Sequence, residues 1–306
     1  MDRDRAEGVL LGLACGDALG RPVEFETPAR ILAQYGEVTE MLGDGTWGKP
    51  AGTVTDDTDM ATCLARSLVA RGGFDPADVA DRFVAWYASE PFDVGTMTAT
   101  ALSRIRDGEP WDVAGQRVWE NSSEGSNAGN GSVMRAAPLA VAYDADETVL
   151  AEASETSSRI THADPRCTAG CAVLTLTLSR LLSDDEAPLS TALDRVDTPA
   201  ALETALRPVS TGDVDPDELR STGYVVDTLQ TARWHGLHAD TAEAALVDVV
   251  NMGGDADTVG AVTGAVVGAR FGRTALPAAW LDSLDGVDDL ADLARELAAL
   301  DCSRRP

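Results

Sequence analysis

The order of hydrophobic and polar positions along the chain predicts helices almost everywhere. Apolar residues recur three and four positions apart, which is the spacing of one buried helix face. Alternating runs typical of strands are scarce, and no Asn-Gly turn joins two β-branched segments. We therefore predict an all-α fold. The expected helices span residues 4–20, 57–71, 76–89, 96–107, 111–120, 131–143, 146–160, 165–183, 198–206, 221–235, 239–251, 256–272 and 286–301.

Two of these helices carry a glycine at every fourth position. A glycine costs about 1 kcal/mol of helix propensity relative to alanine. Residues four apart lie on one helix face, and a row of glycines there lets a second backbone approach closely. We expect two tightly packed core helices, with the residues before the second lying near the loop after the first. The glycines are Gly8, Gly12, Gly16 and Gly20 in the first helix and Gly260, Gly264, Gly268 and Gly272 in the second.

Two polar stretches interrupt the helical pattern. Residues 121–131 form a loop rich in glycine, asparagine and serine just before a predicted helix. Residues 183–220 are acidic and contain several prolines, which is typical of either a domain boundary or a surface excursion. Because apolar helices continue on both sides, we expect a single domain over residues 1–306 with a surface excursion at 183–220.

The charge balance narrows the range of partners. The 306 residues include 24 basic and 51 acidic ones, a formal net charge of −27. Such a surface repels nucleic acid and anionic membranes, so neither is an expected partner. Lys49 is the only lysine, and the acids are scattered, whereas a partner-binding tail would concentrate them in one block. The composition favours a solvated acidic shell suited to a high-salt cytoplasm, where charges are strongly screened.

Cysteine and histidine usage indicates a reducing compartment. The five cysteines form no CxxC pair, and Cys167 and Cys171 are spaced to share one helix face. Only three histidines occur, so an imidazole-rich zinc site is not expected. The first residues do not resemble a signal peptide, and no apolar run is long enough to span a membrane. We therefore expect a cytoplasmic protein.

Aspartates cluster at the starts of two predicted helices. For either cluster alone, helix capping and the helix dipole are as good an explanation as ligand binding. Side by side, the carboxylates would repel one another unless a cation neutralised them, and ligands with only oxygen donors suit Mg²⁺, Mn²⁺ or Ca²⁺ in a two-metal site. The spacing along the chain does not establish that the clusters meet. They comprise Asp56, Asp57 and Asp59 in TDDTD, and Asp255, Asp257 and Thr258 in GGDADT.

Two further features are candidates for chemistry. Glu24 follows the helix-breaking Pro22 and is flanked by Val23 and Phe25, so it is either a general acid or base or an ordinary surface glutamate. The Gly-Asn-Gly stretch at 129–131 has small residues at a helix start, which can hold phosphate or simply precede a capped helix.

Taken together, these residues resemble the ADP-ribosylglycohydrolase family, which includes the dinitrogenase-reductase-activating glycohydrolases. Eight motifs match in order along almost the whole chain. They are GLACGDALGRPVEF (12–25), GTVTDDTDMA (52–61), PFDVGTMTATAL (91–102), AGNGSVMRAAPLA (128–140), THADPRC (161–167), TGYVVDTLQTARW (222–234), NMGGDADTVGAVTGAVVGARFG (251–272) and LPAAWLDSL (276–284).

The resemblance implies a compact orthogonal multi-helix bundle with two Mg²⁺ or Mn²⁺ ions in a central cleft. Glu24 matches a mobile-loop glutamate that positions or activates water, and Asp93 matches an aspartate near the metals and the leaving group. Asp59 matches no ligand position and is interpreted as a dipole partner or a surface acid. The implied metal ligands are Thr55, Asp56, Asp57, Asp255, Asp257 and Thr258, with Asp257 as the bridge.

The resemblance also implies a substrate-binding surface. Ala128 departs from the family, which often has an aromatic residue or serine there, and Asp-Ala-Asp at 255–257 departs from the more usual Asp-Thr-Asp. Neither departure removes an implied ligand. The implied binding residues are Asn127, Gly129, Asn130, Gly131 and Ser132 at the diphosphate, His162 in the cleft, and Gly223 and Tyr224 at the adenosine.

The implied function is metal-dependent hydrolysis of the glycosidic bond between ADP-ribose and an acceptor. The implied partner is an ADP-ribosylated protein or a small ADP-ribose conjugate, and the acceptor group stays open among arginine, serine, an acetyl ester and a nucleic-acid end. Asp93 would suit a guanidinium group, since a carboxylate pairs with it bidentately. Two alternatives stay open: a catalytically silent ADP-ribose-binding or structural relative, and a two-metal phosphohydrolase. We expect a monomer.

Overall fold

The structure, a computed structural model, describes residues 2–123, 125–143 and 146–300. These residues form sixteen α-helices and four short 3₁₀-helices, and within them no strand is present beyond two isolated bridges, Asp44–Lys49 and Gly129–Tyr224. The all-α fold class predicted from the sequence is therefore confirmed.

The helices follow one another with short connections. The first seven α-helices are α1 (Arg3–Gly20), α2 (Pro28–Tyr35), α3 (Asp56–Arg71), α4 (Pro76–Tyr87), α5 (Thr96–Arg106), α6 (Trp111–Asn121) and α7 (Ala137–Ala142). The others are α8 (Glu147–Arg159), α9 (Pro165–Leu182), α10 (Pro188–Leu193), α11 (Ala200–Thr211), α12 (Val225–His238), α13 (Ala242–Val250), α14 (Ala256–Phe271), α15 (Ala278–Ser283) and α16 (Val287–Ala298). The 3₁₀-helices are η1 (Arg21–Val23), η2 (Gly45–Trp47), η3 (Pro216–Glu218) and η4 (Arg273–Ala275).

The helix expected at 131–143 is wrong in its start, because α7 begins only at Ala137. A helix that began at 131 would place Pro138 in its interior, where proline has no N–H to donate and its ring clashes with the preceding turn. With the later start, Pro138 lies in the first turn of α7. Residues 131–135 are instead a turn that continues the Gly-Asn-Gly loop.

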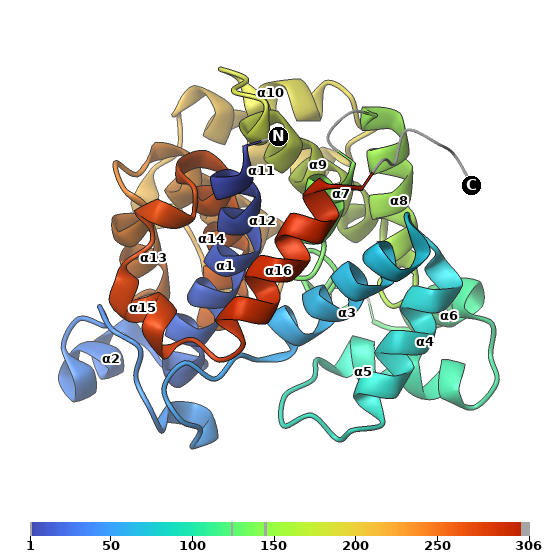
Figure 1. Ribbon diagram of the computed structural model, residues 1–306, viewed down its shortest axis with the longest axis horizontal. Coiled ribbons are helices and arrows are strands. Elements are labelled where there is room, and N and C mark those ends of the chain that lie inside the picture. The colour runs from blue at the N-terminus through green and yellow to red at the C-terminus, as the bar shows by residue number, and fades with distance from the viewer. Residues whose placement is uncertain (1, 124, 144–145, 301–306) are drawn as a thin grey trace.

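Helices α1 and α14 pack against each other through their glycines. An added Cβ would meet the partner carbonyl oxygen at 2.1 Å for Gly12 against Gly264, and at 2.0 Å for Gly16 against Gly260. The pairing order is antiparallel, since Gly8 faces Gly268 at the other end. In Figure 1 the two helices lie together near the middle of the molecule, with α16 beside α1. The expected close approach is confirmed, and it brings the start of α14 to the end of α1.

Buried Arg21 fastens the segment between α1 and α3. Its side chain is fully buried, and the guanidinium donates to the backbone carbonyls of Thr53 (3.0 Å), Pro50 (3.0 Å) and Leu42 (3.1 Å). The hydrogen bonds of one side chain therefore order this loop, which has little regular secondary structure. The loop leads to the start of α3, which lies beside α1.

The acidic stretch 183–220 contains helical structure that the sequence pattern only partly predicted. Its helices α10 and α11 pack against α9 and α12. Leu189, Leu193, Leu202 and Leu206 from these two helices are buried in the same hydrophobic core as the rest of the protein. The short helices α2, α10 and α15 were not predicted, because six to eight residues give too few turns for a clear helical period. The single-domain organisation stays a prediction.

The thiols are inert interior groups in the described part of the chain. Cys15, Cys167 and Cys171 are buried and free, Cys63 is half-buried and free, and Cys302 lies outside the described residues. Burial raises the pKa of Cys15 to about 12. Among the described residues, no helix has the length and apolar character that a membrane span requires.

A methyl group in the glycine contact between α1 and α14, here called the glycine seam, should destabilise the protein. In Gly264→Ala the new Cβ would lie 1.9 Å from the Gly12 carbonyl oxygen. Helix propensity alone would stabilise this variant by about 1 kcal/mol, but forcing the helices apart costs about 1–3 kcal/mol. We expect a net loss in the free energy of unfolding, measured with urea. Gly43→Ala, where the nearest atom is Ala51 N at 3.5 Å, is the control; equal stability of the two variants would contradict the seam.

Candidate functional site

The two aspartate clusters meet through one carboxylate. Thr55 caps α3, and Asp255 precedes the first turn of α14. The hydroxyl groups of Thr55 and Thr258 both donate to Oδ2 of Asp57, each at 3.2 Å. Residues from opposite ends of the chain therefore form one buried polar cluster at the N-termini of α3 and α14.

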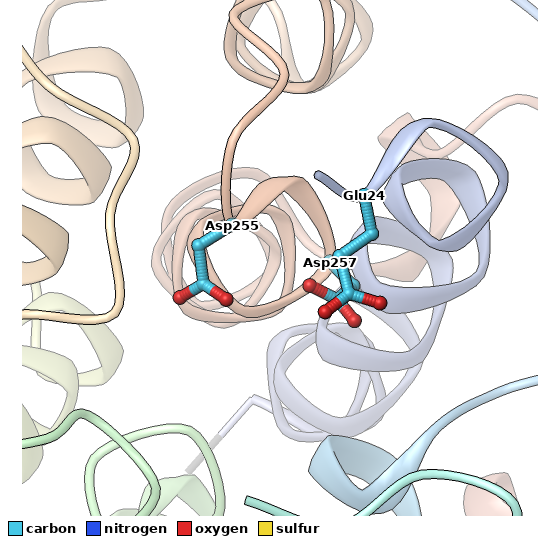
Figure 2. A group of neighbouring side chains, drawn as sticks. All are labelled: Glu24, Asp255 and Asp257. Carbon is cyan, nitrogen blue, oxygen red and sulfur yellow. The ribbon is translucent and has the colours of Figure 1, made fainter. Parts of the chain in front are cut away.

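Further carboxylates gather at the same place. One oxygen from each of Glu24, Asp255 and Asp257 lies within 4.8 Å of the other two. Figure 2 shows Asp255 and Asp257 at the start of α14, with the carboxylate of Glu24 beside that of Asp257. Asp56 and Asp93 line the same cleft. The structure thus brings together acids from four separate segments of the chain.

Burial and mutual repulsion weaken these acids. Burial raises the pKa of Asp56, Asp57 and Asp257 well above the usual range, and the neighbouring carboxylates raise each of them further. Burial, and then the charge of Asp93, raise the pKa of Glu24 to about 8. Burial, and then a neighbouring carboxylate, raise the pKa of Asp93 to about 6. All five groups would ionise more readily beside a cation.

The cluster fits hard divalent cations. Oδ1 of Asp57 is buried and has no hydrogen-bond partner among the residues that the structure describes. The donors in the group are carboxylate and hydroxyl oxygens, which Mg²⁺ and Mn²⁺ prefer. An unpaired buried carboxylate oxygen among other acids is costly unless a cation binds it.

Asp17 holds the first turn of α3 and was not recognised as a site residue from the sequence. Its carboxylate is fully buried on α1. It accepts hydrogen bonds from Thr55 N (3.0 Å), Thr58 N (3.1 Å) and Thr58 Oγ1 (2.5 Å). Its sequence signal is that no other charged residue occurs between Glu7 and Arg21. Asp17 therefore links the glycine seam to the start of α3.

Asp59 has a structural partner of its own. It lies in the first turn of α3, and Oδ2 accepts a hydrogen bond from Trp86 Nε1 at 3.0 Å. It is half-buried and does not line the cleft. Of the two interpretations made from the sequence, the first-turn position is the one observed, with an indole partner that the sequence did not indicate.

The Gly-Asn-Gly loop lines the cleft, which has a volume of about 420 Å³. Asn130 N donates to Gly223 O at 3.1 Å, so this loop and the start of α12 are joined. The Asn130 amide donates to Thr228 Oγ1 (2.9 Å) and also to the Asp255 carboxylate. Asn130, which the resemblance places in the diphosphate loop, therefore also orients a carboxylate of the cluster.

Of the sixteen residues assigned to the site from the sequence, eleven line the cleft directly and five do not. The eleven are Glu24, Asp56, Asp93, Gly129, Asn130, Gly131, His162, Gly223, Asp255, Asp257 and Thr258. The five that lie behind or beside its lining are Thr55, Asp57, Asn127, Ser132 and Tyr224.

Two of those five are joined by an arginine. Arg166 donates to Asn127 Oδ1 (3.1 Å) and to the Tyr224 hydroxyl (3.2 Å), and its guanidinium lies 5.5 Å from the Tyr224 ring centre. Asp164 pairs with the same guanidinium at 2.8 Å. Ser132 is turned inward, because its hydroxyl accepts a hydrogen bond from Ser158 at 2.9 Å. Arg166 was part of a matched motif but had no predicted role.

An aromatic rim borders the carboxylates. Trp47 Nε1 donates to Glu24 Oε2 at 2.6 Å, and Thr46 Oγ1 donates to the Glu24 carbonyl at 2.6 Å. Phe25 follows at a positive φ of 63° and is 67% exposed. The Trp47 ring also lies 5.6 Å from that of Phe92. Glu24 is therefore held in place by the η2 segment, on the wall of an open cleft.

Comparisons with known proteins identify similar sequences over almost the whole chain. A sequence model described as ADP-ribosylglycohydrolase matches residues 1–306. The chain is 38% identical to the ADP-ribosyl-[dinitrogen reductase] glycohydrolase of Rhodospirillum rubrum over 92% of this chain and 90% of that protein. It is 34% identical to the ADP-ribosylarginine hydrolase Tri1 of Pseudomonas putida over 96% and 78% of the two chains.

A solved structure is similar as well. The structure titled "ADP-ribosylglycohydrolase-related protein complex" is 36% identical and superposes with a TM-score of 0.81. The likeness covers 97% of this chain and 98% of the other. The fold of nearly the whole chain therefore has a counterpart among solved structures.

The cation-free protein should lose stability as pH rises from about 4 to about 8. An acid whose folded pKa lies above its unfolded value of about 4 stabilises the fold at low pH, and this stabilisation is lost as pH rises through the folded pKa. The folded pKa is about 6 for Asp17 and Asp93 and about 8 for Glu24. We expect the free energy of unfolding, measured with urea in concentrated KCl, to fall with pH in this way when a chelator has removed divalent cations. With Mg²⁺ added, the dependence on pH should be shallower. Equal slopes would contradict cation binding here.

Replacing Asp17 by asparagine should weaken divalent-metal binding. The amide cannot accept all three hydrogen bonds from Thr55 and Thr58, so the first turn of α3 loses its support. Disturbing groups that orient metal ligands typically costs 10–100-fold in metal affinity. We expect a drop of about tenfold or more for Asp17→Asn by titration calorimetry with Mn²⁺. Asp59→Asn, in the same turn but bonded to Trp86, is the matched control; equal affinities would refute this role.

Proposed function

Because this chain belongs to the ADP-ribosylglycohydrolase family, we propose that it hydrolyses the glycosidic bond linking ADP-ribose to an acceptor and releases ADP-ribose. The observation that carries the proposal is the cleft itself. It combines a cluster of oxygen ligands, built from both aspartate motifs, with the Gly-Asn-Gly loop and His162 on its walls. A ligand with sugar hydroxyls at one end and a diphosphate at the other suits such a lining.

We propose two divalent ions, Mg²⁺ or Mn²⁺, at the carboxylate cluster. Bound there, they would neutralise the acids, hold hydroxyl groups of the ribose and polarise a water molecule. The absent partner of Asp57 Oδ1 and the raised pKa values of the cluster support this assignment. The residues that would hold the ions are Thr55, Asp56, Asp57, Asp255, Asp257 and Thr258.

Glu24 and Asp93 are the proposed groups for the bond-breaking step. Glu24, oriented by the indole of Trp47, would take a proton from the water that attacks the anomeric carbon. Positive charge develops on the ribose as its bond to the acceptor breaks, and the surrounding carboxylates favour it. Asp93, half-buried on the cleft wall, would face the leaving acceptor.

The remaining proposed residues hold the rest of the ligand. Backbone groups of Gly129 and Gly131 would bind the diphosphate, since small residues allow its close approach. Tyr224, whose hydroxyl and ring are both contacted by Arg166, would stack on the adenine. Gly223 links the two regions, because its carbonyl accepts a hydrogen bond from Asn130 N.

Arginine-linked ADP-ribose is the first linkage to test. A relative of this chain is named an ADP-ribosylarginine hydrolase. A carboxylate such as Asp93 forms bidentate hydrogen bonds with a guanidinium. Serine, acetyl-ester and nucleic-acid linkages are the other arms of the same assay.

The acidic surface supports the proposal that the enzyme works at high salt concentration. With 51 acidic and 24 basic residues, the protein is suited to concentrated salt, where screening removes much of the repulsion. We propose a cytoplasmic, monomeric enzyme of a halophilic cell that acts on ADP-ribosylated protein or small conjugates. The assays below are therefore set at high KCl.

Removing a cluster aspartate should abolish ADP-ribose release. Disturbing a group behind a metal ligand costs about 10–100-fold, so Asp56→Ala or Asp257→Ala should cost more than about 100-fold in kcat/KM. Chelation should have the same effect on the wild type, and Mg²⁺ or Mn²⁺ should reverse it. Asp81→Ala, at an exposed position on α4, is the control.

The products separate the proposed function from its rivals. Mass spectrometry of an ADP-ribosylarginine digest should show intact ADP-ribose, whereas a phosphohydrolase would release AMP or phosphate. Tight ADP-ribose binding by calorimetry without turnover on any linkage would identify a binding protein. Either result would overturn the glycohydrolase assignment.

A further inference from the structure

Two polar atoms on the cleft wall, one of them fully buried, lack hydrogen-bond partners within the described part of the chain. Thr98 is 1% exposed, and its Oγ1 bonds to nothing there. His162 is 2% exposed as a residue and lines the cleft, and its Nε2 bonds to no atom of the described residues. Both atoms flank Gly131, since a Cβ added to that residue would lie 3.1 Å from Thr98 Oγ1 and 3.2 Å from His162 Nε2. A buried polar atom without a protein partner is free to bond a ligand or a water molecule.

The opposite side of the His162 ring is fully bonded. Nδ1 lies 2.7 Å from Thr161 Oγ1, which in turn lies 2.7 Å from Arg135 Nη2. All three residues are buried, with Thr161 and Arg135 at 0% exposure. Arg135 Nη1 also donates to the carbonyl of Gly131 at 2.9 Å. The Arg135 guanidinium therefore contacts both Thr161, which bonds to His162, and Gly131 of the Gly-Asn-Gly loop.

The direction of these hydrogen bonds follows from chemistry. A guanidinium can only donate, so Thr161 Oγ1 accepts from Arg135. The hydroxyl proton of Thr161 then needs an acceptor, and Nδ1 of His162 is the acceptor within reach in the described structure. If Nδ1 carried the proton instead, the Thr161 hydroxyl would be a buried donor without a partner, which costs about 1–3 kcal/mol.

A neutral ring agrees with its surroundings. Burial, and then the charge of Arg135, lower the pKa of His162 to about 3. With Nδ1 accepting a hydrogen bond, the single ring proton of the neutral imidazole must be on Nε2.

We propose that Thr161, held by Arg135, is a positioning residue that fixes His162 as the neutral Nε2–H tautomer, so that its N–H donates to a ligand oxygen beside Gly131. Thr98 lies across Gly131 and would bond the same ligand through its hydroxyl. The identity of the ligand as the diphosphate of ADP-ribose rests on the proposed function, whereas the tautomer does not.

A neutral donor is suited to this cleft. Carboxylates at its other end repel the oxygens of a diphosphate, so donors are needed to hold them. The backbone N–H groups of Gly131 and Ser132 bond to no atom in the described structure and are available for the same purpose. A neutral ring N–H adds to them without a buried positive charge, whose desolvation is costly.

The tautomer can be read by nitrogen NMR of the ¹⁵N-labelled full chain without ligand at pH 7. The chain has three histidines, and His235→Asn and His238→Asn variants assign the His162 signals. We expect a protonated-type shift for Nε2 and an unprotonated-type shift for Nδ1. A ring protonated at Nδ1, or at both nitrogens, would overturn the proposal.

Two substitutions test Thr161 itself. Thr161→Ser keeps the hydroxyl and should keep the tautomer, while Thr161→Val removes the donor and should give a mixture or the Nδ1–H form. The Kd for ADP-ribose, measured with Mg²⁺ by calorimetry, should be about fivefold weaker for valine than for serine, the effect of one neutral hydrogen bond. Thr177→Val, a buried threonine of α9 bonded to Val173 O, is the control.

The experiments distinguish a failure of the Thr161 proposal from a failure of the proposed function. Identical tautomer and affinity in Thr161→Val and Thr161→Ser would refute the role of Thr161. If the wild-type ring is the Nε2–H tautomer but ADP-ribose does not bind, the proposed function is wrong and the assignment of the N–H to a diphosphate falls with it. Circular dichroism and the unfolding midpoint of each variant show whether it is folded.

Discussion

The contact between α1 and α14 is the constraint on which the rest of the structure depends. Glycines on both helices let carbonyl oxygens lie where side chains would otherwise be, at 2.0 Å from an added Cβ at Gly16. Since the helices are antiparallel, the start of α14 with Asp255 and Asp257 lies beside the end of α1 and Glu24. Asp17 on α1 then holds the first turn of α3. Two distant aspartate motifs meet because one helix contacts both.

The buried carboxylates of the cleft repel one another. The nearby buried arginines do not neutralise the acids by direct contact. Arg21 donates to backbone carbonyls, and Arg135 donates to Gly131 and Thr161. The carboxylates are supported instead by neutral donors such as the Asn130 amide and Thr258. Such donors set the orientation of an acid but leave its charge, so binding of divalent cations would relieve repulsion that the fold itself does not.

Much of this arrangement was readable from the sequence, because the relevant signals are local or repeated. Helical periodicity predicted most helices, and the glycine rows predicted the seam. The late start of α7 was missed although Pro138 indicated it. The roles of Asp17 and Asn130 could not be read, because each depends on partners far away in the chain: Thr55 and Thr58 for one, Asp255 for the other.

The two ends of the cleft also differ in chemistry, and no single motif indicates this difference. Hydroxyl and carboxylate oxygens gather at the start of α14, while unpaired donors and the small residues of the Gly-Asn-Gly loop lie around Gly131. Asn130 joins the two ends, since its backbone belongs to the loop and its amide holds Asp255. A ligand of the proposed kind would therefore be oriented by charge: its anionic part would be repelled from the acids and attracted to the donors. This leaves a neutral, hydroxyl-bearing part at the carboxylates, where bond cleavage would occur.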